Sequence, residues 1–393
     1  MADVIDMAEY GEGFRDDPHP VYAHLRELGP VHRVRLPPPE SYDTWLVVGY
    51  EEARAALADP RLAKDVAGLD VRPREEEVIG KHLLTADPPQ HTRLRSLVTR
   101  AFTARRVEAL RPRIQAITDE LLDAMLPLGR ADLVESFSYP LPITVICELL
   151  GVPEMDRAAF REMSNEFVAP TSEDGFVRSV DRLAAYLTDL IEDKRGAGPA
   201  DDLLGALIRT TAEDGDRLSP QELRGMAFLL LIAGHETTVN LITNSVHTLL
   251  RHPAQLAEVR ADPGLVDAVV EETLRYEGPV ENATFRYAAE PLEIGGTAVA
   301  RGEPVLIGLA AADRDTTRYP AADRFDLHRD TQGHLAFGHG IHFCVGAPLA
   351  RMEARTALRT LLRRAPGLAL DGPPGEWLPG MLIRGTRTLP VRW

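Results

Sequence analysis

Residues 337–346 read Phe-Gly-His-Gly-Ile-His-Phe-Cys-Val-Gly, and this stretch decides how the rest of the chain is interpreted. Cys344 lies just before a predicted helix that begins near Ala347. Amide groups at a helix N-terminus stabilise a thiolate and lower the pKa of the cysteine. Gly340 and Gly346 permit a positive φ and a close approach of the backbone to a flat or bulky group. A thiolate in such a nest of amides suits iron binding or nucleophilic catalysis.

The residues of this segment leave two other interpretations open. Cys344 alone is also compatible with a buried structural cysteine at a loop–helix junction. His339, His342 and Cys344 form a possible zinc site, although a fourth ligand and the usual paired spacing are lacking nearby. Phe337 and Phe343 are expected to keep water away from the sulfur.

A second signal interrupts the longest predicted helix. Residues 219–222, Ser-Pro-Gln-Glu, form a capping box with proline at the first helical position, and the helical pattern continues to Arg251. Inside it, residues 233–238 read Ala-Gly-His-Glu-Thr-Thr. Gly234 costs about 1 kcal/mol relative to alanine in a helix, and Glu236 is expensive to bury unpaired. Such broken local rules indicate a site that delivers protons, with a solvent-facing polar stripe as the alternative.

Together these two motifs resemble those of the cytochrome P-450 family. Residues 337–346 match its haem-ligating signature, Phe-x-x-Gly-x-x-x-Cys-x-Gly, and residues 233–238 resemble its oxygen-activation motif. The resemblance covers nearly the entire chain. It implies a single domain over residues 1–393, mainly α with a small β part, which is the triangular haem domain with a long central helix. The implied cofactor is haem b, with O2 as co-substrate.

The resemblance also implies roles for individual residues. Cys344 is expected to be the axial ligand of the haem iron, as a thiolate that favours O–O cleavage. Glu236 and Thr237 are expected to guide protons to O2, and Ala233 and Gly234 to leave room for it. The expected cofactor-binding residues, which include the propionate contacts, are His91, Arg95, Arg286, Phe337, His342 and Gly346.

Glu272 and Arg275 lie one helical turn apart and resemble the family's Glu-x-x-Arg pair. Taken alone, this spacing describes an ordinary surface pair. The resemblance implies that the pair is buried with Arg324 as a third member and that the trio is structural. Asp313 departs from the asparagine usual in the family, and we expect it to affect local hydrogen bonding only.

The composition sets broader limits. The 393 residues carry 44 basic and 60 acidic side chains, a net charge of −16, which argues against nucleic-acid and membrane binding. Two cysteines rule out a disulfide framework. The N-terminus does not resemble a signal peptide, and the longest apolar run, residues 226–233, is far short of the ~20 residues of a membrane span. We therefore expect a cytoplasmic protein, and a monomer.

The pattern of helices and strands is mainly helical. Helices are predicted over residues 20–28, 50–58, 91–126 with a break near 102, 140–150, 156–167, 176–194, 219–251, 265–276 and from 347 to before 366. Strands are predicted over residues 31–36, 44–48, 292–294 and 305–308. Residues 310–340 are expected to be irregular.

Electrons for the reaction are expected from another protein, because no Gly-rich dinucleotide fingerprint follows a strand. The resemblance to bacterial members implies a ferredoxin, reduced by an NAD(P)H-dependent ferredoxin reductase. Complementary charges steer such partners toward each other, so two arginine-rich segments are candidates for the surface that binds the donor. The alternative is that these arginines only form two solvated helix faces. The arginines expected to receive the donor are Arg93, Arg95, Arg100, Arg105 and Arg106, with Arg351, Arg355, Arg359, Arg363 and Arg364.

The substrate is expected to be a sizeable hydrophobic molecule. Residues 275–286 resemble those of actinomycete enzymes that hydroxylate or epoxidise macrolides and other polyketides in antibiotic biosynthesis. The residues implied to contact substrate are Leu229, Val280, Asn282, Met381 and Leu382. Residues 75–77, three glutamates, can pair with an amino-sugar ammonium or form a solvated acidic loop. A peroxygenase driven by H2O2 and a non-catalytic haem-binding partner of a biosynthetic enzyme are the alternative functions.

Overall fold

A computed structural model of the chain shows a mainly helical fold with a small β part, as the sequence predicts. The structure describes residues 4–37, 42–65, 78–152, 160, 163–164, 166–167, 172–198, 202–209 and 218–393. The contacts divide the chain into two compact units. The first unit comprises Met1–Ala63, Thr118–Tyr139 and Thr237–Trp393, and the second comprises Lys64–Ile117 and Pro140–Glu236. The single domain over residues 1–393 stays a prediction.

The first unit contains the sheets. A six-stranded sheet has the order β1 (Ile5–Asp6), β2 (Val31–Arg35), β3 (Asp43–Val47), β9 (Pro304–Ile307), β6 (Arg286–Ala288) and β4 (Leu62–Ala63). β2 and β3 are antiparallel, with Val31 opposite Val47, whereas β3 and β9 are parallel, with Trp45 opposite Val305. The smaller sheets are β10 (Ala369–Leu370), β11 (Pro390–Arg392) and β5 (Arg130–Asp132), and the hairpin β7 (Leu292–Ile294) and β8 (Thr297–Val299).

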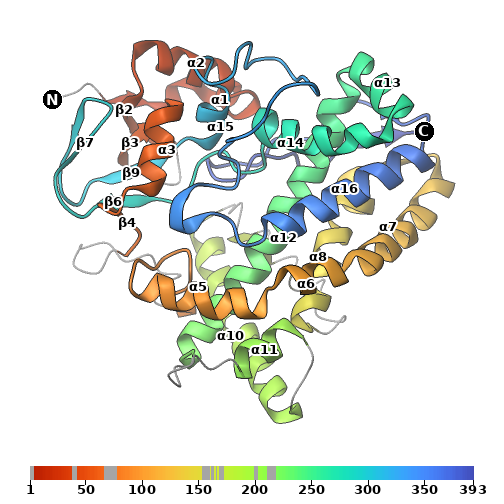
Figure 1. Ribbon diagram of the computed structural model, residues 1–393, viewed down its shortest axis with the longest axis horizontal. Coiled ribbons are helices and arrows are strands. Elements are labelled where there is room, and N and C mark those ends of the chain that lie inside the picture. The colour runs from red at the N-terminus through yellow and green to blue at the C-terminus, as the bar shows by residue number, and fades with distance from the viewer. Residues whose placement is uncertain are drawn as a thin grey trace. The chain divides into compact units, whose positions relative to one another are not determined.

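The first unit also contains helices, some of which pack against the sheet and others against one another. They include α1 (Gly11–Asp16), α2 (His19–Leu28), α3 (Tyr50–Ala58), α13 (Pro253–Ala261), α14 (Val266–Glu277), α15 (Leu309–Asp313) and α16 (Ala347–Arg364). α14 and α16 pack against each other (Figure 1). The short helix α15 overlaps residues 310–340, which the sequence predicted to be irregular. Its three alanines are buried, and a run of identical small residues shows no helical periodicity in the sequence.

The second unit consists of helices in the part of the chain that the structure describes. They are α5 (Gln90–Ala101), α6 (Ala104–Ala109), α8 (Pro140–Leu150), α10 (Glu173–Ala197) and α11 (Leu203–Arg209). α11 packs on α5, α8 and α10. Of the helix predicted over 156–167, residues 156–159, 161–162 and 165 lie outside the described residues, as do the glutamates at 75–77.

The longest helix, α12 (Pro220–Leu250), carries residues of both units. Its predicted capping box is confirmed, because the Glu222 amide donates to Ser219 Oγ at 3.1 Å and the Ser219 amide donates to Glu222 Oε2 at 2.9 Å. α12 is long and apolar enough to cross a membrane, a property that the core helices of soluble proteins share. Within its most apolar 18 residues, 78% is buried, which is typical of a core helix.

Candidate active site

Cys344 lies in a loop that main-chain hydrogen bonds hold in place. We call residues 334–346 the cysteine loop. The Cys344 amide donates to the Phe337 carbonyl at 2.9 Å, and the Gly338 amide donates to the Leu335 carbonyl at 2.7 Å. The thiol is exposed and lies three residues before the start of α16. Its position near a helix N-terminus stabilises the thiolate form.

Gly340 shows why the cysteine loop needs glycine. Its φ is +73°, and a Cβ there would lie 3.0 Å from the carbonyl oxygen of Leu57 and 3.1 Å from Cα of Ala58. Any side chain would therefore push the loop away from the end of α3. The prediction that Gly340 serves a close backbone approach is met here by α3 itself.

Two aromatic residues of the loop differ in burial. Phe337 is half-buried, and the guanidinium carbon of Arg351 lies 4.5 Å from the centre of its ring. Phe343 is 42% exposed and Ile341 is 49% exposed. The ring centres of Phe337 and Phe343 lie 6.3 Å apart, and the expectation that these rings keep water away from the sulfur stays a prediction.

Charged groups anchor the start of the cysteine loop. The carboxylate of Asp313 accepts a hydrogen bond from the Leu335 amide at 2.7 Å, and burial raises its pKa to about 7. Glu271 accepts from Arg351 Nε at 2.7 Å and lies 3.3 Å from His334 Nε2. Although burial alone raises it, hydrogen bonds from His334 and Arg351 lower the pKa of Glu271 to about 2. Asp313, the departure noted in the sequence, thus holds the loop directly.

One side of α12 is less buried than the rest of the helix in the part of the chain that the structure describes. Ala233 is exposed, and Leu229, Gly234 and Thr237 are half-buried, whereas most of the helix is buried. These four positions, at spacings of four, one and three residues, share one side of the helix. A Cβ at Gly234 would lie 2.9 Å from Cδ1 of Ile146, so this glycine also serves packing against α8.

Glu236 belongs to a buried polar trio. Its Oε1 lies 3.1 Å from Ser164 Oγ and 3.1 Å from His235 Nε2. His235 Nδ1 lies 2.6 Å from the Leu231 carbonyl, which can only accept, so Nδ1 carries a proton. Nε2 therefore accepts from Ser164 when the ring is neutral, and donates to Glu236 when the ring is charged. The trio can hold a proton beside the carboxyl group, a role that the sequence did not predict for His235.

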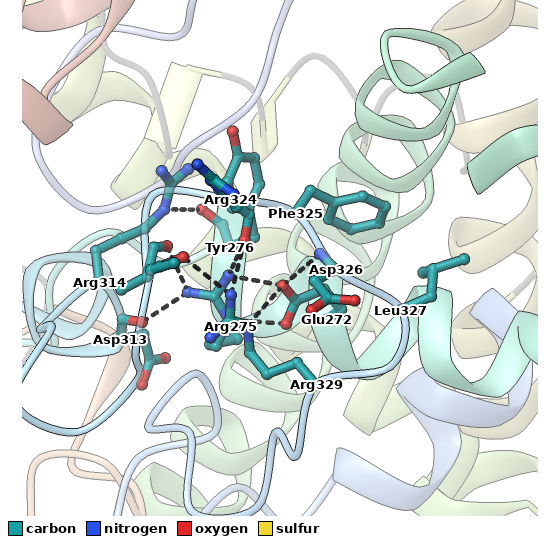
Figure 2. Close-up of polar contacts among 12 residues, drawn as sticks. Glu272, Arg275, Tyr276, Asp313, Arg314, Arg324, Phe325, Asp326, Leu327 and Arg329 are labelled. Atoms are coloured by element: carbon teal, nitrogen blue, oxygen red, sulfur yellow. Dashed lines mark hydrogen bonds and ion pairs between the residues drawn. The ribbon is translucent and has the colours of Figure 1, made fainter. Parts of the chain in front are cut away.

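Glu272 and Arg275 form a fully buried ion pair (Figure 2). Arg275 Nε donates to Glu272 Oε2 at 2.8 Å, and its Nη2 donates to Oε1 at 2.7 Å. The same guanidinium donates to the carbonyls of Asp313, Ala322 and Arg324 at 2.9–3.0 Å. The pair therefore ties α14 to the segment that precedes the cysteine loop.

The third charged member of this network is Arg329, which corrects the prediction for Arg324. Arg329 Nε lies 3.3 Å from Glu272 Oε1, and its side chain is 9% exposed. Arg324 takes part through its carbonyl, while its side chain is exposed. Figure 2 shows Arg329 close to Glu272, on the same loop as Arg324 and Asp326. The sequence contained Arg329 in a similar position, but nothing in it distinguished the two arginines.

The four predicted propionate contacts occur in pairs, one pair in each unit. Arg286 in β6 is buried and donates to the Leu62 carbonyl at 3.2 Å, and His342 belongs to the short helix η6 (Gly340–His342). His91 and Arg95 lie one turn apart on α5, and burial together with Arg95 lowers the pKa of His91. Their role toward haem stays a prediction.

The predicted substrate residues divide into two kinds. Val280 is half-buried and Leu382 is 40% exposed, so both present apolar surface. Met381 is largely buried, and Asn282 is fully buried with its amide donating to the Met381 carbonyl at 2.7 Å. Asn282 is therefore engaged inside the fold, which corrects its expected role as a substrate contact.

The predicted electron-transfer arginines are partly neutralised. Arg355 pairs with Glu271 at 3.0 Å, Arg359 with Asp267 at 3.4 Å, and Arg93 with Glu222. Arg364 pairs with Asp123 at 2.5 Å. Arg105 and Arg363 have exposed side chains. The acidic partners lie on other helices, so counting the arginines along one segment of the sequence did not show that they are paired.

The zinc interpretation finds no support in the geometry. Among the described residues, which include His339, His342 and Cys344, no group of three His, Cys, Asp or Glu side chains could hold a metal ion.

Known proteins resemble the chain over nearly its whole length. A model of the family described as Cytochrome P-450 matches residues 155–365. Cytochrome P-450 monooxygenase PikC of Streptomyces venezuelae is 57% identical over 395 residues, covering 99% of this chain and 94% of its own. The 6-deoxyerythronolide B hydroxylase of Saccharopolyspora erythraea is 46% identical, covering 100% of this chain and 99% of its own.

Solved structures give the same result for the fold. The P-450 monooxygenase TamI, bound to tirandamycin C, has a TM-score of 0.91 and 44% identity, with 99% of each chain covered. A myxobacterial cytochrome P-450 in complex with myristic acid has a TM-score of 0.91 and 42% identity, covering 98% of this chain and 99% of its own.

Proposed function

The chain belongs to the cytochrome P-450 family and is a monooxygenase, and from this premise we propose that it hydroxylates or epoxidises a macrolide or a related polyketide in antibiotic biosynthesis. The proposal is supported by relatives named as a 6-deoxyerythronolide B hydroxylase and a mycinamicin IV hydroxylase/epoxidase. The partly covered apolar side chains Val280 and Leu382 support a hydrophobic substrate. The proposed location is the cytoplasm.

The described residues of the first unit fit haem. Cys344 supplies a single soft sulfur donor, exposed at a helix N-terminus, which is the ligand chemistry of a haem thiolate. Arg286 and His342 of the same unit offer nitrogen donors for propionates. When bound, haem supplies the redox chemistry by which O2 is split and one oxygen atom enters the substrate.

The chain's own residues supply position and protons. Glu236 and Thr237 are proposed to deliver protons from the α12 side, with His235 Nε2 and Ser164 Oγ holding a proton at the Glu236 carboxyl group. The overall reaction balances as substrate plus O2, two electrons and two protons giving oxygenated product and water. The two electrons are proposed to come from NAD(P)H through a ferredoxin reductase and a ferredoxin, with Arg105 on the docking face.

The carrying observation is the exposed Cys344 thiol in its anchored loop. The reduced protein with CO should show a thiolate-type Soret band, which Cys344→Ser should abolish while haem absorbance remains. Mycinamicin IV and 6-deoxyerythronolide B serve as substrate probes with ferredoxin, its reductase, NADPH and isotopically labelled O2. One labelled oxygen atom in the product supports the proposal. Turnover that H2O2 alone sustains and that ferredoxin does not improve would contradict it.

A further inference from the structure

Three buried polar side chains contact one another next to Val280 and Leu382, two residues that are predicted to contact the substrate. Tyr22 of α2 and Asn282 are fully buried, and Glu281 is 4% exposed. The Tyr22 hydroxyl donates to Glu281 Oε1 at 2.5 Å. Asn282 Nδ2 donates to the Tyr22 hydroxyl oxygen at 3.3 Å and to the Met381 carbonyl at 2.7 Å. The three side chains thus link α2, residues 279–283 and residues 381–384.

The two loop segments are also joined through their backbones. The Glu281 amide donates to the Leu382 carbonyl, and the Arg384 amide donates to the Pro279 carbonyl, both at 2.9 Å. The Ala310 amide donates to the Glu281 carbonyl at 3.0 Å, which holds the first segment against α15. The position of one segment therefore fixes that of the other.

Polar and apolar side chains of these segments have separate surroundings. Val280 and Leu382 are partly covered, whereas Glu281 and Asn282 are buried among protein groups. Burying polar groups is unfavourable unless they are hydrogen-bonded, and the hydrogen bonds that join these three side chains favour one arrangement of the backbone. Among the described residues, Asn282 Oδ1 has no hydrogen-bond partner, so its amide donors supply the links. Apolar residues in the same places would pack without fixing the spacing of the segments.

Resting on the proposed function, we propose that Tyr22, Glu281 and Asn282 are positioning residues that set the spacing of residues 279–283 against 381–384 and thereby the substrates and orientations that the site accepts. None of the three needs to touch the substrate. They act through the partly covered Val280 and Leu382.

Several charged groups surround the cluster. Burial raises the pKa of Glu281 to about 7, and the nearby Arg384 opposes this rise. Arg384 Nε donates to Glu277 Oε1 at 2.8 Å, and His19 of α2 and Arg314 lie 3.5 and 3.7 Å from the same carboxylate. These groups compensate Glu277, so the charge that changes near neutral pH inside the cluster is that of Glu281.

The first test measures amide hydrogen exchange in the haem-loaded protein. Tyr22→Phe should raise exchange in peptides covering residues 279–283 and 381–384 by about two- to tenfold, the range of one net hydrogen bond. Tyr50→Phe is the matched control, because its buried hydroxyl donates to the Gly333 carbonyl at 2.7 Å, away from both segments. Equal exchange in the two variants would overturn the proposal.

The second test measures discrimination with probes that need no native substrate. The ratio of the dissociation constants of 4-phenylimidazole and imidazole, read from the Soret shift, should change in Tyr22→Phe and Glu281→Gln and stay constant in Tyr50→Phe. With each dissociation constant calculated for the neutral azole, the wild-type ratio should also change with pH near 7, and Glu281→Gln should remove that change. A constant ratio in both cluster variants overturns the specificity role.

The two proposals fail in distinguishable ways. If neither mycinamicin IV nor 6-deoxyerythronolide B is oxidised, the proposed substrate class fails, while the exchange and azole measurements still decide the positioning role. If a macrolide is oxidised, and the ratio of products oxidised at different positions is the same in the wild type, Tyr22→Phe and Asn282→Ala, the positioning role fails and the proposed function stands.

Discussion

Replacing Arg329 or Arg324 by alanine should change the stability of the protein by different amounts, because only the Arg329 side chain belongs to the buried network. Arg329 donates from Nε to Glu272 Oε1 at 3.3 Å, from Nη1 to the Pro320 carbonyl at 2.6 Å, and from Nη2 to the Ala321 carbonyl at 2.9 Å. Arg324 offers its carbonyl, which an alanine retains, and its side chain is exposed. Arg329→Ala should therefore be costly and Arg324→Ala close to neutral.

The magnitude follows from the hydrogen bonds. Each contributes about 0.5–1.5 kcal/mol net, and Glu272 keeps Arg275 as its main partner, so Arg329→Ala should cost about 2–3 kcal/mol. Arg324→Ala should stay within about 0.5 kcal/mol, as surface substitutions do. For 393 residues, an unfolding entropy of about 0.8 kcal/mol per kelvin converts the larger value to a fall in Tm of about 2–4 °C.

Differential scanning calorimetry of the haem-loaded variants measures this difference, with the CO spectrum confirming that the cysteine ligand is retained. Arg275→Met serves as the upper reference, because breaking a buried pair costs about 3–5 kcal/mol. Equal Tm values for Arg324→Ala and Arg329→Ala would refute the assignment of Arg329 as the third charged member.

Three further predictions concern the loop, the proton supply and the electron donor. Gly340→Ala should lower haem retention on gel filtration, because a Cβ would lie 3.0 Å from the Leu57 carbonyl oxygen at a φ of +73°; full retention contradicts this. His235→Phe should raise the H2O2 released per NADPH consumed, because Glu236 loses a partner at 3.1 Å, and an unchanged ratio removes His235 from proton supply. Arg105→Glu should reduce the ferredoxin-supported rate most at low salt, with H2O2-supported turnover as its control; an unchanged ferredoxin rate excludes this residue from the docking face.

Local patterns predicted the elements that depend on neighbouring residues. The capping box of α12 was visible because its two reciprocal hydrogen bonds join residues three apart. The cysteine loop was recognised from the spacing of Phe337, Gly340 and Cys344 within one continuous stretch. Both features are determined within a few residues, so the sequence contains what is needed to find them.

Features that depend on distant segments could not be predicted. Asn282 turns inward because Tyr22 and Met381, 260 and 99 residues away, offer it partners. The positive charge of Arg359 is partly neutralised by Asp267, which lies 3.4 Å away on another helix. Which charge meets which partner is decided by the packing of helices, and one sequence does not show it.

The stability of the cysteine loop should depend on pH in opposite directions at its two anchors. Asp313 has a pKa raised to about 7, so ionisation is disfavoured in the fold and stability falls as pH rises from about 4 through 7. Glu271 has a pKa lowered to about 2, so its contribution is present above about pH 4.5 and is lost as pH falls below that value.

Haem retention against pH should therefore be greatest near pH 4 to 4.5, because the contribution of Glu271 is lost below this range and that of Asp313 is lost above it. Asp313→Asn keeps an acceptor for the Leu335 amide, which Asp313 now binds at 2.7 Å, and should remove the loss on the alkaline side. Glu271→Gln should remove the loss on the acidic side and lower retention throughout, because Arg351 and His334 lose their charged partner. An Asp313→Asn profile that still falls between pH 4.5 and 7 as the wild type does would place the alkaline limit elsewhere, and Glu281, with its pKa also near 7, would be the next group to exchange.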